Sequence, residues 1–227
     1  MSCAPWRWPA TPEDLAREQE RLAKRTPEPW RPAEGAPRVG ACAIVFGRGE
    51  RGDTGWAAAV VEEAGEVIST STCVCRIETP FRPGQLALRE GPILEAVARR
   101  LSRRPDVLLV AAAGRDHPLR AGLALHLGAA LDLPTVGVTE DPLVAVGDAP
   151  GRAWSSVAPL RIAGEVVAYR VRTRGGAKPV VAHAAWRTSP EVAADVVLGS
   201  CAIARWPEPM REARRIAREL RHAFRVE

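Results

Sequence analysis

The stretch that decides the fold is residues 107–138, which read VLLVAAAGRDHPLRAGLALHLGAALDLPTVGV. It opens with an apolar run over residues 107–112, continues with helical apolar spacing over 122–131, and closes with a second apolar run over 134–138. Short continuous apolar runs are typical of strands buried on both faces, and the helix between them supplies the crossover that parallel strands require. The stretch therefore predicts a strand, helix and parallel strand of an α/β protein.

Upstream of this unit, the sequence predicts three consecutive strands. An apolar run over residues 39–46 is followed by a glycine-rich turn at 47–55, and strands at 56–61 and 66–77 follow around a second turn. Short connections of this kind join antiparallel strands, so we expect a three-strand antiparallel meander. A helical pattern over 93–101 leads from the meander to the parallel unit. The combination resembles a ribonuclease H-like mixed sheet flanked by helices, one of several mixed α/β folds that periodicity alone allows.

Both ends of the chain carry predicted helices. Thr11-Pro12-Glu13-Asp14 is a helix start, and that helix runs to about Lys24. We place this helix and a proline-rich linker at residues 1–38 and the ribonuclease H-like region at residues 39–227, and together they form one globular domain. After residue 138 we expect strands at 165–172 and 180–182, a helix from Ser189 through Leu198 and a C-terminal helix from Pro207.

Composition narrows the class of protein. The chain has 227 residues with 46% hydrophobic content, and its longest apolar run is too short to cross a membrane. The net charge of +5 comes mainly from arginine, which permits a nucleic-acid partner, whereas 5% aromatic content leaves little material for a base-stacking platform. The five cysteines lack the spacing of a disulfide framework or a zinc site. We therefore expect a monomer in a reducing cytoplasm, with no membrane association.

Four blocks of sequence carry a family resemblance. They are PFRPG at residues 80–84 with LREGP at 88–92, PDVLLV at 105–110 with GRDHPLRAGLALHLG at 114–128, PTVGV at 134–138, and RWPEPMR at 205–211. In order and spacing they resemble the P-Y-I-P-G with F-R-E-G-P, P-D with D-G-x-G-x-x-H-P-R, P-T-I-G-V and R-x-P-E-P-x-R blocks of endonuclease V. The resemblance covers roughly residues 12–220.

The resemblance implies a metal-dependent nuclease that hydrolyses a phosphodiester 3′ of deoxyinosine in DNA, or of inosine in RNA. Such chemistry requires hard oxygen ligands for Mg²⁺, which the family gathers from an Asp on the first strand, the Glu of F-R-E, the Asp of D-G-x-G and a His before a late helix. Here these positions hold Cys42, Glu90, Ala111 and Trp186, and the family's lysine after P-T-I-G-V-A is replaced by Glu140. Only Glu90 of the expected acidic cluster remains.

These losses predict a site filled by apolar side chains and an endonuclease V-like protein that is catalytically impaired or inactive. We expect no cofactor and weak residual binding to inosine-containing or distorted DNA or RNA. Two alternatives remain open. One is an active Mg²⁺- or Mn²⁺-dependent endonuclease V with a rearranged site around Glu90, using Asp116 or His183 as relocated ligands or Cys42 as a thiolate. The other is an interaction or scaffold protein on a nuclease fold, with an unknown partner.

The resemblance also implies a nucleic-acid interface. In the family the P-Y-I-P segment parts the strands beside the modified base; here Phe81 keeps an aromatic ring and Arg82 adds a charge, although the segment is equally a rigid proline turn. The glycines permit either turns or a close approach to a flipped base, and the Arg before Glu90 meets either phosphate or that carboxylate. The residues assigned to this interface are Pro80, Phe81, Arg82, Pro83, Gly84, Arg89, Gly114, His117, Arg120 and Gly122.

Two features fall outside the resemblance. Cys73 and Cys75 share one face of the predicted strand at 66–77, which indicates strand packing or an exposed pair, with a redox role as the alternative. The C-terminal helix mixes arginine with glutamate, a pattern more typical of a solvated charged face than of a stripe that follows phosphates.

Overall fold

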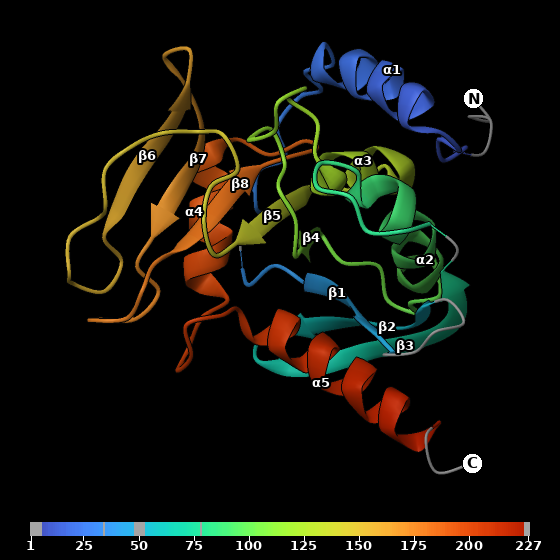
Figure 1. Ribbon diagram of the computed structural model, residues 1–227. Helices are drawn as coiled ribbons and strands as arrows, with labels where there is room; N and C mark the ends of the chain where they lie inside the picture. Colours follow the sequence, from blue (N-terminus) through green and yellow to red (C-terminus); the bar gives the residue numbers. More distant parts are fainter. Residues whose placement is uncertain (1–5, 34, 48–52, 78, 225–227) are drawn as a thin grey trace.

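The computed structural model describes residues 6–33, 35–47, 53–77 and 79–224, and in them an eight-stranded mixed sheet has helices on both faces (Figure 1). The strand order is β3-β2-β1-β4-β5-β8-β7-β6. The predicted α/β class with a ribonuclease H-like sheet is confirmed. Residues 48–52 of the predicted glycine-rich turn, and Cys3, lie outside the described residues.

The meander forms as predicted. Strands β1 (Val39–Phe46), β2 (Asp53–Glu63) and β3 (Glu66–Ile77) are antiparallel neighbours. The turn between β2 and β3 places Ala64 and Gly65 at φ 50° and 84°, a left-handed conformation that glycine adopts without strain. Strand β3 lies at one edge of the sheet.

The parallel part of the sheet also follows the prediction. Strand β4 (Val107–Val110) lies parallel to β1 on one side and to β5 (Thr135–Thr139) on the other. Helices α2 (Leu86–Arg99) and α3 (Leu123–Leu131) make the connections before and after β4. Because β1, β4 and β5 are parallel, their C-terminal ends lie along the same side of the sheet. The residues that follow β4 and β5 therefore lie on the side where β1 ends.

The second half of the sheet differs from the prediction by one strand. Strands β6 (Val157–Ile162), β7 (Glu165–Val171) and β8 (Val180–Ala184) are antiparallel, and β8 pairs with β5. Strand β6 was not predicted because Pro159 interrupts its sequence pattern. The structure accommodates this proline at the other edge of the sheet, where one side of a strand needs no ladder donor.

The helices begin where capping residues allow. Thr11 caps α1 (Pro12–Ala23) and Ser189 caps α4 (Pro190–Gly199), each by accepting a backbone N–H bond. Helix α5 (Glu208–Ala223) closes the chain. Helix α2 begins at Leu86, seven residues before the predicted start, and continues through Pro92.

Two apolar cores hold the layers together. One face of the sheet packs on α2 and α3 through residues such as Cys42, Leu108 and Leu125, with α1 packed against these helices, and the other face packs on α4 and α5 through Leu109, Val197 and Ala213. Leu108 and Leu109 are adjacent in β4 but point to opposite faces, which is why its apolar run is continuous. None of the helices in the described ranges is long and apolar enough to span a membrane.

The segment before α1 packs on α2 and α3 through two tryptophans. The Trp8 ring stacks on His126 with centroids 6.3 Å apart, and Trp6 meets the same imidazole edge-on at 6.4 Å. The Trp8 indole N–H donates to Glu95 at 2.6 Å. Gly91 makes room for Trp8, because a Cβ there would lie 2.1 Å from the ring. Burial of His126 lowers its pKa to about 4, so the ring is neutral at physiological pH.

Candidate functional site

Three of the four positions expected to ligate metal gather at one edge of the sheet. Cys42 in β1 pairs with Val110, the last residue of β4, and Ala111 follows directly. The Cys42 side chain is 2% exposed, and its pKa is raised to about 12 by burial and, secondarily, by the nearby charge of Glu90. Cys42, Ala111 and Glu90 are therefore neighbours, as the resemblance implies.

Glu90 is the carboxylate that survives at this edge. It lies in the second turn of α2 and is partly buried, and burial raises its pKa to about 7 against the opposing charge of Arg89. A carboxyl group that shares a site with metal or with cations is normally ionised well below neutral pH. Glu90 therefore lies in surroundings that disfavour its charge.

Trp186 does not fill the space beside Ala111. Its backbone N–H donates to Thr135 Oγ1 at 3.1 Å and its carbonyl accepts from the Thr135 N–H at 2.9 Å, at the start of β5 rather than at its end. The Trp186 side chain is buried, and the Arg25 guanidinium lies 4.7 Å from its ring centroid. Ala111 is exposed. Cys42 is therefore buried as expected, but Trp186 is buried elsewhere and Ala111 faces solvent, so the expected apolar filling does not form beside Ala111.

These residues do not fit the Mg²⁺ ion that the family resemblance implies. Magnesium prefers several hard oxygen ligands, whereas burial keeps the Cys42 thiol protonated, Ala111 has no donor atom and an indole N–H cannot accept. Among the residues that the structure describes, no three His, Cys, Asp or Glu side chains form a group that could hold a metal ion. Glu90 is left as a single ligand.

Asp116 and His183, the proposed relocated ligands, form a separate buried pair. Both side chains are fully buried, with Asp116 Oδ2 3.5 Å from His183 Nδ1. The Asp116 carboxylate accepts backbone N–H bonds from Leu143, Val144 and Ala145 at 2.7–2.8 Å. His183 Nε2 lies 2.7 Å from the Thr139 hydroxyl oxygen. Their polar atoms thus anchor the segment after β5.

The loop at residues 80–84 is exposed throughout, as a binding element requires. The Phe81 side chain is 63% exposed, and the Gln85 N–H donates to the Arg82 carbonyl at 3.0 Å, which closes a turn. Gly84 has φ 76°, so this position favours glycine. The loop therefore presents an aromatic ring and a charge on a defined backbone.

A buried polar contact fastens this loop to the rest of the protein. His117 is 6% exposed; its Nδ1 accepts from the Leu119 N–H at 3.2 Å and its Nε2 lies 3.3 Å from the Gly84 carbonyl oxygen. Burial lowers the His117 pKa, and its contacts with Gly84 and Asp116 oppose that effect. Gln19 of α1, 3.5 Å from the same nitrogen, also donates to the Ala121 carbonyl at 3.0 Å. Gln19 was not predicted, although a polar residue between Leu15 and Leu22 on an apolar helix face was the available signal.

The remaining interface residues are engaged within the protein. Arg89 is 7% exposed, stacks 4.3 Å from the centroid of Phe46 and donates to the Thr79 carbonyl at 2.7 Å. Arg120 pairs with Glu165 and keeps 25% of its side chain exposed. A Cβ at Gly114 or Gly122 would lie 2.1 or 2.2 Å from a backbone carbonyl oxygen, so close packing within the protein already requires both glycines.

The position of the family's lysine carries the opposite charge and is neutralised locally. Glu140 pairs with Arg205 Nη1 at 2.9 Å, and Arg205 also donates to the carbonyls of Lys178 and Pro179. This pair was not predicted, since Glu140 and Arg205 belong to different blocks of the sequence. The C-terminal helix has the expected mixed face, on which Arg215 pairs with Glu212 and Glu219.

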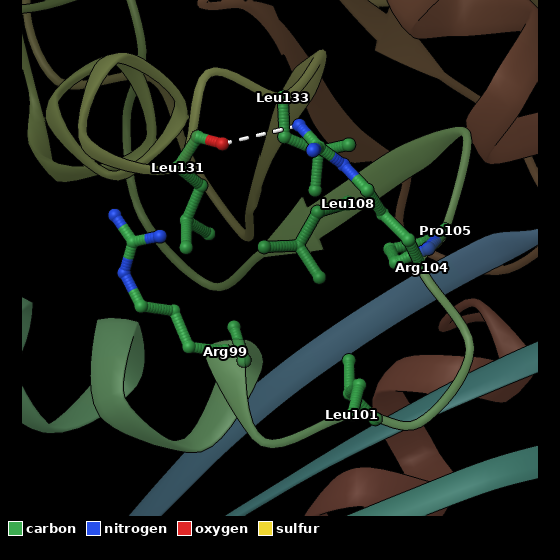
Figure 2. Close-up of a pocket in the computed structure, with 8 residues that line it drawn as sticks. Arg99, Leu101, Arg104, Pro105, Leu108, Leu131 and Leu133 are labelled. Atoms are coloured by element: carbon green, nitrogen blue, oxygen red, sulfur yellow. Dashed lines mark hydrogen bonds between the residues drawn. The ribbon is translucent and has the colours of Figure 1, made fainter. Parts of the chain in front are cut away.

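A cavity of about 320 Å³ lies elsewhere, at the C-terminal ends of α2 and α3 (Figure 2). It is lined by Arg99, Arg104 and the side chains around Leu108, near the start of β4, whereas Ala111 follows its end. Arg104 donates to the carbonyls of Leu131 and Asp132 at 3.2 and 2.7 Å and so satisfies the last turn of α3. This cavity is separate from the degenerate metal site.

Comparisons with known proteins agree with this geometry. The family model described as Endonuclease V matches residues 20–215. Endonuclease V of Methanopyrus kandleri is 37% identical over 230 residues, which cover 100% of this chain and 96% of that protein. The crystal structure of endonuclease V from Streptomyces avermitilis has a TM-score of 0.86 at 33% identity and covers 96% of each chain. Endonuclease V of Ciona intestinalis, in complex with a 24-mer DNA containing an inosine followed by a ribo-adenosine, has a TM-score of 0.75 at 22% identity, covering 95% of this chain and 98% of that chain.

Proposed function

Because the chain belongs to the endonuclease V family, we propose that it binds inosine-containing or distorted nucleic acid and has lost efficient metal-dependent cleavage. One contrast carries the proposal: the loop at residues 80–84 is exposed and fastened in place, whereas Glu90 is the single carboxylate left at the expected metal-ligand positions.

The exposed ring of Phe81 supports the binding half of this proposal. A phenylalanine that is 63% exposed on a proline turn loses no packing when it inserts between bases, and apolar side chains of this kind replace the stacking that a distorted duplex has lost. The contact between His117 and Gly84 restrains the backbone before binding, which reduces the entropy cost of ordering the loop. A relative of this fold binds inosine-containing DNA.

We assign the phosphate contacts to two arginines. Arg82 is an exposed residue of the loop itself and follows Phe81. Arg120 has to exchange Glu165 for a phosphate, which is a modest change because exposed ion pairs contribute little stability. Arg89 serves the interface indirectly, since it holds Thr79 at the base of the loop.

The donor set at the expected metal site supports the catalytic half of the proposal. Members of the family depend on a divalent ion to stabilise the charge that develops on phosphate. The buried thiol of Cys42 and the methyl group of Ala111 supply no hard ligand, and the raised pKa of Glu90 weakens the remaining one. Loss of this ion removes on the order of 10³-fold or more in rate.

The experiment measures fluorescence anisotropy with matched and inosine-containing duplexes at several salt concentrations. We expect weak binding that prefers the inosine duplex and falls steeply with salt. Phe81→Ala should remove the preference and leave the salt dependence unchanged, whereas Arg82→Ala should weaken binding to both duplexes and reduce the salt slope by about one. Phe224→Ala is the matched control, because Phe224 is also exposed but lies at the end of α5.

Two results would overturn this function. Absence of binding even at low salt would end the nucleic-acid proposal and favour the scaffold alternative. Cleavage in Mg²⁺ or Mn²⁺ that Glu90→Gln abolishes would instead favour an active enzyme with a rearranged site around Glu90.

A further inference from the structure

A second chemical site lies between the edge strand β3 and helix α2, where two cysteines have no role in the proposed function. A cavity of about 350 Å³ is lined on one side by Cys73, Cys75 and Arg76 of β3, and on the other by residues of α2 that include Leu88 and Pro92. Both thiols are free and partly buried, unlike Cys42 and Cys201, which are buried in the cores. The cavity therefore offers two sulfur atoms at a surface that a small ligand can reach.

The two thiols are neighbours on the same face of the strand. Residues two apart in a strand point to the same side. Their partners on β2 are Ala57 and Gly55, which have small or no side chains, and the Ile44 and Ile77 side chains pack over Gly55. Burial raises the pKa of Cys75, and the Cys73 thiol raises it further, which indicates that the two groups are within electrostatic reach.

Strand geometry decides which chemistry suits this pair. The Cα atoms of residues i and i+2 in a strand are about 6.6 Å apart, and their Cα–Cβ bonds are nearly parallel. A disulfide needs Cβ atoms about 3.8 Å apart, which this strand cannot provide without distortion. With the zinc–sulfur length of about 2.3 Å as a guide, two sulfur atoms that ligate one ion from opposite sides are up to about 4.6 Å apart, and ordinary rotamer changes span that gap. A bridging ion is therefore favoured over a disulfide.

The number of ligands decides the kind of ion. Zinc in proteins takes four ligands, and within the described ranges no group of three or more suitable side chains occurs, here or elsewhere. Thiolates select soft ions, of which Cu(I) is the biological example. We propose that Cys73 and Cys75 bind one soft monovalent metal ion, Cu(I) or its analogue Ag(I), as a two-coordinate bis-thiolate.

The net charge of the bound ion and its two thiolates suits the cavity. Two thiols release two protons as the ion binds, so the ion and its two thiolates carry a net charge of −1. Arg76 and Arg89 line the same cavity and offset that charge. Arg89 also donates to the carbonyl of Thr79, which lines the same cavity and precedes the loop at residues 80–84.

The test is an anaerobic Cu(I) titration against a coloured Cu(I) chelator, with the full chain in a Cys3→Ser background. We expect one Cu(I) per chain, and an affinity at least 100-fold weaker in Cys73→Ser and in Cys75→Ser. Cys201→Ser is the matched control and should bind as the background does, because the Cys201 thiol is buried against the Arg205 carbonyl. Single substitutions that leave the affinity within threefold would overturn the proposal.

X-ray absorption at the copper edge tests the same site without any change at Cys73 or Cys75, and so does not depend on the variants folding. Two sulfur neighbours at one distance are expected. Three or more sulfur neighbours, or nitrogen and oxygen neighbours alone, would overturn the assignment.

Discussion

Glu90→Gln should stabilise this protein at alkaline pH, because the surroundings of Glu90 disfavour its charge. Burial raises the pKa of Glu90 from 4.5 to about 7. Between these two pH values the folded protein binds more protons than the unfolded chain, so stability falls as pH rises. A rise of this size costs the folded state up to about 3 kcal/mol once Glu90 is ionised at pH 8. Glutamine keeps the shape and carries no charge.

The assay is urea unfolding of the wild type and Glu90→Gln at pH values from 4 to 8. We expect the variant to be about 2 kcal/mol more stable at pH 8, the upper figure being reduced because Glu90 is partly exposed. The difference should shrink as pH falls below 7 and become small at pH 4, below both pKa values, where Glu90 is mostly protonated in both states. The buried histidines also titrate in this range, but they are common to both proteins and cancel in the difference.

Glu20→Gln removes a carboxylate from an exposed position on α1 and should leave stability unchanged at every pH. If Glu90→Gln is less stable than the wild type at pH 8, or if the difference does not depend on pH, then a partner holds Glu90 ionised and burial does not disfavour its charge. A rise in wild-type stability on adding Mg²⁺ would identify that partner.

Three other substitutions probe the frame of the site. Asp116→Asn should lower the free energy of unfolding in urea by about 2–4 kcal/mol, because three backbone N–H groups lose a charged acceptor. The exposed control Asp141→Asn should leave the urea midpoint unchanged. An unchanged midpoint in Asp116→Asn would contradict the role of Asp116. Gly91→Ala should cost about 1–3 kcal/mol through its clash with Trp8; the cost should shrink in a Trp8→Ala background, and a purely additive pair would count against the contact. Cys42→Asp combined with Ala111→Asp should give measurable Mg²⁺ binding by calorimetry while neither change alone does, and wild-type binding of equal strength would show that the site was never lost.

Most of the fold could be predicted because its signals are local. The apolar runs at β1, β4 and β5 and the caps at Thr11 and Ser189 lie within short stretches of sequence. Strand β6 escaped prediction because Pro159 weakens its pattern, and only its place at the sheet edge explains why proline is tolerated there. The predicted start of helix α2 was seven residues too late, because proline is typical of the first turn of a helix. Pro92 instead lies inside α2.

The site could be predicted only as a set of positions. The motif spacing placed Cys42, Glu90 and Ala111 together; the pairing of Cys42 with Val110 and the effect of the Glu90 charge on the Cys42 thiol agree with this. Motif spacing gives no information on solvent exposure. It therefore could not predict that Trp186 is buried and that Ala111 is exposed. The contacts of Asp116 with residues 143–145 depend on segments that meet only in the folded chain.

We propose that this chain keeps an endonuclease V interface without the metal-dependent reaction. The most direct measurement is a single-turnover cleavage assay on inosine-containing DNA and RNA, with enzyme in excess, in Mg²⁺ and in Mn²⁺, comparing the wild type with Glu90→Gln. We predict that neither protein gives product above the background of the buffer, although both bind the substrate. Cleavage 3′ of inosine by the wild type, lost in Glu90→Gln, would contradict the claim.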